Sequence, residues 1–250
     1  MADDGMTVGQ FKEVKNSWKQ AKISPPLYAP LLKGRMDAEV STFGLARAIK
    51  AAWTFRKAHG LGKSKHHAID KDKALLFGGP EGLRLVYSDG AALLVVGFGE
   101  ELGPALVLQD GAATMLLDRA VAWANAVIKL EGKFQVPENT TTTIEGLIAS
   151  TSFAVGAPLE LTDMDNDGLI EAWPHFADDI RRLPGKQPGT GRFHVVSRML
   201  AACAAAADAL LPKSSLCLMV PEEQMSPGLF LLSREERAME AAVLFMGAKP

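Results

Sequence analysis

The spacing of apolar residues changes near residue 74, and this change constrains the fold more than any other feature of the sequence. Before it, residues 38–58 repeat apolar side chains at helical spacing. After it come four short runs rich in Leu and Val, at residues 74–77, 83–87, 92–96 and 105–109. Asp89-Gly90 separates the second run from the third, and Asp-Gly favours a hairpin turn because that turn requires positive φ. The pattern predicts a small antiparallel meander.

Most of the remaining chain has the features of helices. Residues 112–130 and the Ala-rich segment 192–211 repeat apolar side chains at helical spacing. Thr142–Glu145 and Ser233–Glu236 each resemble a capping box, in which a hydroxyl and a carboxylate three residues later satisfy the first N–H groups of a helix. The second box predicts a final helix over residues 238–246. The apolar runs at 216–220 and 228–232 suit either a helix or a strand. We therefore expect an α+β fold that is mostly helical, with one small antiparallel β-meander near residues 74–109.

Residues 1–30 are expected to form an N-terminal arm. Within 8–22, Phe11, Val14 and Trp18 recur on one helical side, and Lys12, Lys15, Lys19 and Lys22 line another. Pro25-Pro26 then ends the helix and stiffens a hinge. The alternative is an ordinary first helix packed on its own domain. Beyond the arm we expect an α+β core region over 31–132 and a mainly helical region over 133–250, which could share one domain.

Charge is segregated along a chain whose net charge is only −2. Residues 41–68 contain six Lys or Arg and no acid, and residues 135–179 contain nine acids and no Lys or Arg. Residues 181–207 again contain basic residues and no acid. Basic blocks can hold a phosphate backbone, because each contact releases a counterion. The blocks could instead pair between copies, face one another within one monomer, or be solvated.

The basic blocks give the candidate nucleic-acid-binding residues. They are Arg47, Lys50, Arg56, Lys57, Lys63, Lys65, Arg181, Arg182, Arg192 and Arg198. With the arm, they favour a non-enzymatic, self-assembling structural protein that binds single-stranded RNA, such as a viral nucleocapsid or coat protein. The partners are then the chain itself, as a homo-oligomer, and nucleic acid. The alternative is an intracellular enzyme or small-molecule-binding protein whose site the sequence does not reveal, and a third hypothesis is a calcium-tuned adaptor.

The acidic segment Asp163-Met164-Asp165-Asn166-Asp167-Gly168 resembles the start of an EF-hand calcium loop. Its twelfth position is Pro174 instead of a bidentate Glu, although Glu171 at the ninth could add an oxygen. Asp163, Asp165 and Asp167 are therefore candidate ligands for weak Ca²⁺ binding, or simply an acidic turn. No other cofactor is expected.

Other motifs argue against chemistry. Gly60–Ser64 resembles the end of a phosphate-binding loop, but Lys57 stands where the motif requires Gly. The sequence has no GxSxG, HExxH or CxxC motif, and this favours a protein that is not an enzyme.

Cellular location is inferred from two features. Cys203 and Cys217 are too few for a disulfide framework, which favours a reducing compartment. No apolar stretch is long enough to span a bilayer. We expect a cytoplasmic protein, or one in a virion assembled inside a cell, without membrane contact.

Overall fold

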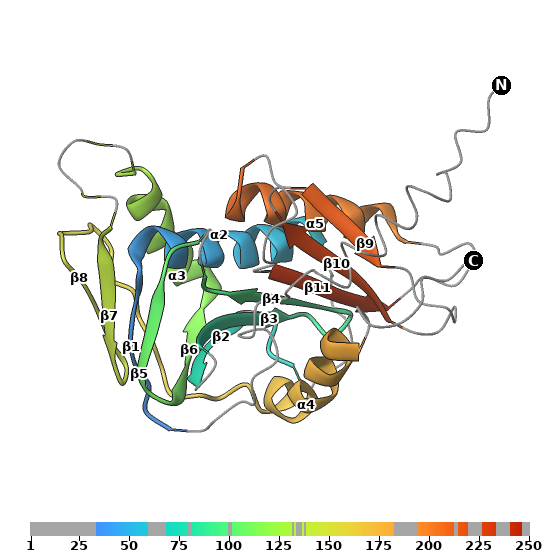
Figure 1. The fold of residues 1–250 in the computed structure, drawn as a ribbon, viewed down its shortest axis with the longest axis horizontal. Coiled ribbons are helices and arrows are strands. Elements are labelled where there is room, and N and C mark those ends of the chain that lie inside the picture. Colours follow the sequence, from blue (N-terminus) through green and yellow to red (C-terminus); the bar gives the residue numbers. More distant parts are fainter. Residues whose placement is uncertain are drawn as a thin grey trace.

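Two antiparallel sheets and the helices around them make up the described part of the protein (Figure 1). The computed structural model describes residues 34–59, 69–79, 82–99, 102–131, 133, 137, 139–182, 195–212, 215–219, 227–233 and 241–246. The four-stranded sheet has the order β5 (Ala105–Gln109), β1 (Asp37–Ser41), β7 (Thr141–Glu145) and β8 (Ile148–Thr151). The seven-stranded sheet has the order β6 (Gly111–Leu116), β2 (Lys73–Gly79), β3 (Gly82–Ser88), β4 (Ala92–Gly97), β11 (Ala241–Met246), β10 (Pro227–Ser233) and β9 (Ser215–Met219).

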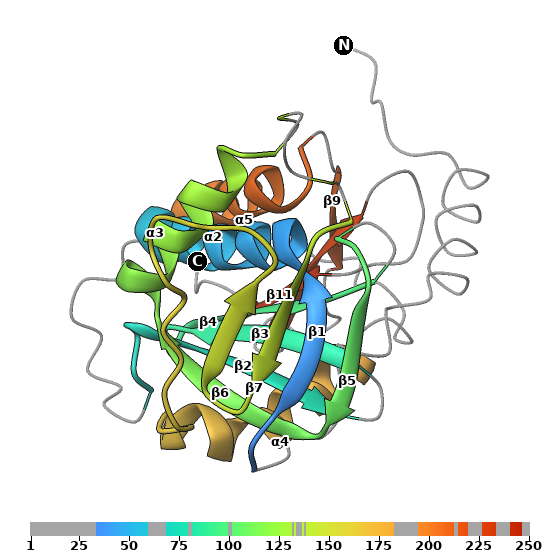
Figure 2. The same ribbon diagram turned by 90° about the vertical axis from the view of Figure 1, so that its left-hand side faces the viewer.

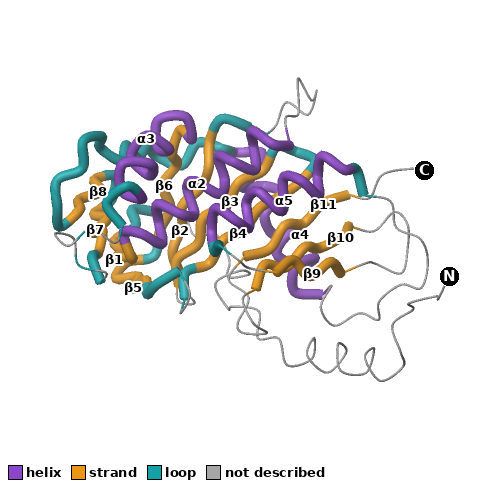
Figure 3. The backbone as a smooth tube through the Cα atoms, turned by 90° about the horizontal axis from the view of Figure 1, so that it is seen from above, coloured by secondary structure: helices purple, strands orange, loops and turns teal. Residues whose placement is uncertain are grey.

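Helices cover both faces of the seven-stranded sheet. α2 (Thr42–His59), α3 (Leu117–Ile128) and α5 (Ser197–Leu210) lie over one face, with α2 between the other two (Figures 1 and 3). α4 (Asp167–Arg182) lies on the opposite face, where Trp173 packs edge-on against Phe77 with ring centroids 5.2 Å apart. Strands buried on both faces are apolar almost throughout, as in β4, where every residue is buried.

The four-stranded sheet has one packed face and one outward face. Ala38, Val40 and Ile144 point inward and join the core shared by α2, α3 and α5. β5 approaches β2 closely at Gly78, where an added Cβ would lie 2.8 Å from a methyl of Val107. None of the described helices covers the outward face, which Figure 2 turns toward the viewer.

Helix α2 begins directly at the end of β1. The Ser41 hydroxyl accepts a hydrogen bond from the Gly44 N–H (3.2 Å), and so satisfies one of the first N–H groups of the helix. The Thr42 and Thr142 hydroxyls are hydrogen-bonded at 2.9 Å, which fixes the junction against β7. β1 therefore sets the position of α2 relative to both sheets.

The predicted mostly helical fold with one small meander is wrong. The described residues form two antiparallel sheets and helices in comparable amount. The expected hairpin at Asp89-Gly90 does form between β3 and β4, with Gly90 at φ 87°. The last run of the expected meander, however, is β5, which leaves this sheet to pair with β1.

The extra strands lie where capping boxes and apolar runs suggested helices. The first box falls on β7, whose Thr-rich sequence suits a pleated strand because β-branched side chains pack well there. The end of the expected final helix is β11, which pairs with β4 and β10. A short apolar run that is buried on both sides has the same sequence pattern in a helix and in a strand, so the segments that pack against it determine which of the two it forms. Ser233 of the second box ends β10, and the other three residues of that box lie outside the described residues.

The division at residue 132 stays a prediction. Both sheets contain strands from either side of it, since β7 pairs with β1 and β11 pairs with β4. The expected N-terminal arm lies outside the described residues. Within the described ranges, no helix is both long and apolar enough to cross a membrane.

Candidate nucleic-acid interface on helix α2

Helix α2 carries the acid-free charge that the sequence singled out. Its buried side, which includes Leu45, Ile49 and Phe55, packs into the core. Arg47, Lys50 and Lys57 fall within one quarter of the helical circumference on the side away from the sheet. Arg56 lies nine residues after Arg47 and so half a turn away, on another side of the helix. The surface row of α2, defined as Arg47, Lys50 and Lys57, therefore excludes Arg56.

The three cations of the surface row differ in their partners. Arg47 forms an ion pair with Glu131, beyond the end of α3. The Lys50 ammonium donates a hydrogen bond of 2.9 Å to the neutral Asn125 side chain and forms no ion pair with a described residue. Lys57 is exposed and likewise forms no ion pair with a described residue, although its charge helps to lower the pKa of Asp118. Lys50 and Lys57 are thus the α2 cations with charge still available to a phosphate.

Trp53 holds these two lysines together. The Lys50 and Lys57 nitrogens lie 4.9 and 5.3 Å from the centre of its ring, within the range of cation–π attraction. The indole N–H donates a hydrogen bond of 3.0 Å to Asp118 of α3. The ring is therefore a platform for the lysines, anchored at its polar end.

Arg56 belongs to a structural ion-pair cluster below the surface row. It pairs with Asp72 and, at 2.9 Å, with Asp118. Hydrogen bonds from Trp53 and Arg56 lower the pKa of Asp118 below its ordinary value. Two carboxylates already neutralise Arg56, so it is a weaker candidate for phosphate contact than the sequence suggested.

The structure brings only part of the predicted basic set together. Arg198 is exposed in the first turn of α5, in the same helical layer as α2. Arg181 and Arg182 end α4, which covers the opposite face of the seven-stranded sheet. Lys63, Lys65 and Arg192 lie outside the described residues. The assignment of these residues to nucleic acid stays a prediction.

The acidic segment has a structural role at the start of α4. Asn166 is buried, and its side chain is hydrogen-bonded to the backbone N–H and C=O of Asp70. Lys73 forms ion pairs with Asp165 at 2.5 Å and Asp70 at 3.2 Å, and the hydrogen bond to Asp165 raises the pKa of Lys73.

Calcium binding at Asp163, Asp165 and Asp167 stays a prediction. α4 begins at Asp167, so the second half of the EF-hand-like segment is helix instead of a ligand loop. The described ranges contain no group of three His, Cys, Asp or Glu side chains arranged to hold a metal ion.

The sequence missed the partners that shape this surface. Asn125, Glu131 and Asp118 come from α3 and its end, about seventy residues from the cations they contact. In the sequence, Trp53 lies at helical spacing from Lys50 and Lys57. That spacing alone did not indicate that the ring is a platform for both lysines.

Comparisons with known proteins give a likeness of fold only. No protein-family model matches the sequence, and no curated protein matches it. Among solved structures, a protein assigned as a DNA polymerase III beta subunit from Eubacterium rectale aligns with TM-score 0.50 and 8% identity, over 86% of this chain and 65% of that one. A Helicobacter pylori beta clamp in complex with diflunisal aligns with TM-score 0.49 and 13% identity, over 89% and 68%.

The prediction of a viral nucleocapsid or coat protein is wrong. The fold of the chain resembles that of a DNA polymerase III beta subunit, so a structural role in a nucleocapsid and a location in a virion lose their support. The alternatives of an enzyme or small-molecule-binding protein and of a calcium-tuned adaptor fit this likeness no better. This chain spans 65% of the E. rectale structure, and the likeness at 8% identity establishes the fold of the chain.

Proposed function

We propose that the protein is a DNA-binding protein with a clamp-like fold that contacts the phosphate backbone of duplex DNA through the surface row of α2. The observation that carries the proposal is the surface row of α2, where Lys50 and Lys57 lie over Trp53 and form no ion pair with a described residue. The likeness of the fold to a DNA polymerase III beta subunit supports DNA as the partner.

The spacing of the two lysines suits a phosphate backbone. Seven residues along a helix correspond to about 10 Å. Phosphates of one DNA strand advance about 3.4 Å each along the duplex axis, so the two ammonium groups can contact phosphates about three nucleotides apart. Arg47 can add a third contact if it exchanges Glu131 for a phosphate.

The Trp53 ring favours backbone contact over base stacking. Single-stranded nucleic acid is often bound by stacking bases on exposed aromatic rings. Here Lys50 and Lys57 already lie over the ring, and the indole N–H is engaged by Asp118. The earlier expectation of single-stranded RNA is therefore replaced in this proposal by duplex DNA, with RNA retained as a competitor in the assay.

We also propose that the protein self-associates. The proposal rests on the likeness of the fold to a DNA polymerase III beta subunit. Size-exclusion chromatography with light scattering, after nuclease treatment and with or without duplex DNA, measures this. A monomer under both conditions contradicts self-association and leaves DNA contact to be tested separately.

The DNA contact is tested by fluorescence anisotropy with a labelled duplex at several salt concentrations. Binding to B-DNA weakens with a slope of log K against log salt of about −0.9 per phosphate contact, so two lysines give about −1.8. Lys57→Gln should weaken all sequences alike and flatten the slope by about 0.9. Arg35→Gln is the matched control, because Arg35 is exposed near the far end of β1 from α2. Equal loss with both variants, or stronger binding to single-stranded RNA than to the duplex, contradicts the proposal.

A further inference from the structure

The outward face of the four-stranded sheet exposes large apolar side chains on both of its edge strands, β5 and β8. Leu106 and Leu108 of β5 are 56% and 62% exposed, and Ile148 of β8 is 67% exposed. Five large hydrophobic side chains are exposed in the described part of the chain, and these three lie on one sheet face. Exposed large apolar groups that share one open sheet face indicate a surface that receives a partner.

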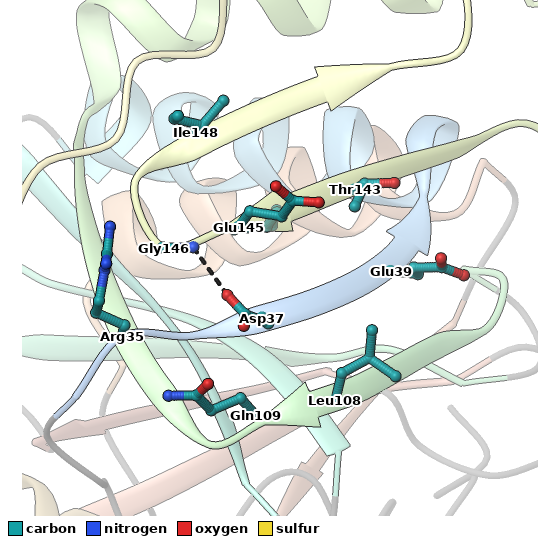
Figure 4. Close-up of a pocket in the computed structure, with 10 residues that line it drawn as sticks. Arg35, Asp37, Glu39, Leu108, Gln109, Thr143, Glu145, Gly146 and Ile148 are labelled. Carbon is teal, nitrogen blue, oxygen red and sulfur yellow. Dashed lines mark hydrogen bonds between the residues drawn. The ribbon is translucent and has the colours of Figure 1, made fainter.

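Acidic groups occupy the middle of the same face. Asp37 and Glu39 of β1 and Glu145 of β7 alternate with buried residues, so all three point outward on the two central strands, between the apolar side chains of the edge strands β5 and β8 (Figure 4). Asp37 accepts a hydrogen bond of 3.0 Å from the Gly146 N–H. The side chains of Glu39 and Glu145 form no hydrogen bond or ion pair with another described residue. Together with Leu108, Ile148 and one base, Arg35, they line a pocket of 580 Å³.

We propose that this face is the docking site for residues 8–22 of the same chain. That segment combines Phe11, Val14 and Trp18 on one predicted helical side with four lysines and one glutamate, a net charge of +3. The pocket lining carries three acids and one base, a net charge of −2. The segment thus offers apolar groups to the exposed apolar side chains of the face, and positive charge to its acidic groups.

The dimensions of the two surfaces agree. Fifteen residues of α-helix are about 22 Å long and about 10 Å wide. Four strands with a spacing of about 4.8 Å give a sheet about 19 Å wide, and five-residue strands are about 17 Å long. A helix laid diagonally across the sheet therefore covers both the exposed apolar side chains of the edge strands and the acidic groups between them.

The tether favours docking within one chain. Arg35 lines the pocket, and twelve residues separate it from Lys22, a maximal reach of about 45 Å. A short tether gives an effective concentration in the millimolar range, so even a weak contact is occupied. Nucleic acid is disfavoured as the occupant because the acidic groups of this face repel phosphate. The inference does not depend on the proposed function of α2.

The test uses the fluorescence of Trp18 in the full chain, isolated as the difference between wild type and Trp18→Phe. Docking predicts that Trp18 is shielded from the neutral quencher acrylamide. Leu108→Lys should expose Trp18 to the level seen in the urea-unfolded chain, since this change removes an apolar contact and adds a positive charge that repels the lysines of the segment, without touching the core. Leu200→Lys is the matched control, because Leu200 is exposed on α5 and should leave Trp18 shielded.

Charge is tested separately. Glu39→Lys combined with Glu145→Lys should also release Trp18, and Asp208→Lys, an exposed acid on α5, should not. A zero-length carbodiimide cross-linker should join a lysine of 8–22 to Glu39 or Glu145 within one chain, as identified by mass spectrometry.

Four results would overturn the inference. If acrylamide quenches Trp18 as strongly in the folded chain as in the unfolded chain, the segment does not dock. Shielding that persists in Leu108→Lys places the segment on another surface. Shielding that is lost on dilution, with a dimer in light scattering, identifies a second copy as the site of docking. Shielding that arises only with phosphatidylserine vesicles identifies a lipid surface as the partner of the segment.

Discussion

Gly44→Ala is expected to destabilise the protein although helix propensity alone predicts the reverse. Gly44 lies in the first turn of α2, and an added Cβ would lie 1.9 Å from the carbonyl oxygen of Leu102 and 3.0 Å from its carbonyl carbon. Even a tight contact requires about 3.0 Å, so the two backbones must separate by roughly 1 Å. The obstacle is backbone, and Leu102 is buried, so no flexible side chain can absorb the shift.

The magnitude follows from two opposing effects. Ala in place of Gly gains up to ~1 kcal/mol in helix propensity. Overpacking a tight contact costs ~1–3 kcal/mol, and the upper end applies where backbone must move. The expected net loss is about 1–2 kcal/mol in the free energy of unfolding. For a chain of this size each kcal/mol lowers Tm by about 2–4 °C.

The assay is urea unfolding followed by circular dichroism, with thermal unfolding as a second measurement. Gly156→Ala is the matched control, because an added Cβ there meets nothing within 4 Å. That variant should be neutral or more stable by up to ~1 kcal/mol. If Gly44→Ala is as stable as wild type or more stable, the close approach between α2 and Leu102 does not exist.

Three further predictions concern the ionisable groups. Asp118→Asn should lower the free energy of unfolding at pH 7. The difference from wild type should vanish as pH falls through the folded-state pKa of Asp118, which is lowered below 3.8. Urea unfolding at a series of pH values measures this difference, and a difference that does not change with pH refutes the prediction. Burial raises the pKa of Cys203 to about 12. In a Cys217→Ser variant, where Cys203 is the single thiol, a thiol reagent should therefore label the folded chain no faster than it unfolds. Rapid labelling contradicts the burial. Ca²⁺ should bind the acidic segment no more tightly than ~10⁻⁴ M, and Lys73→Gln should strengthen binding by removing the ammonium that pairs with Asp165; calorimetry without heat from either protein at millimolar Ca²⁺ removes the metal site.

Local signals predicted local structure well. The Asp89-Gly90 turn, the central helical periodicity of α2 and the Ala-rich α5 all depend on neighbours close in sequence, and each element formed. Strand β11 was missed because Ala241–Phe245 is apolar throughout, and only its pairing with β4, some 150 residues earlier, makes it a strand. Pairing over such a distance leaves no periodic trace in a single sequence.

The candidate surface was predicted in part for the same reason. The absence of acids from residues 41–68 located the charge on α2. It could not show that α3 neutralises Arg47 and shares Asp118 with Arg56, because those contacts form only when the two helices pack. The alternation of polar and apolar residues at 37–41 was a visible strand signal that would have located Asp37 and Glu39 on one sheet face.

Lysine acetylation with and without duplex DNA tests the central claim most directly. Mass spectrometry of the acetylated chain gives the rate at every lysine, so the protein reports its own contact surface. The account predicts that DNA slows acetylation of Lys57 and Lys50 and leaves unchanged that of Lys73 in β2, which pairs with the acidic segment. Acetylation of Lys57 and Lys50 at the same rate in both samples, under conditions where DNA is bound, would contradict the assignment of α2 as the DNA-binding surface.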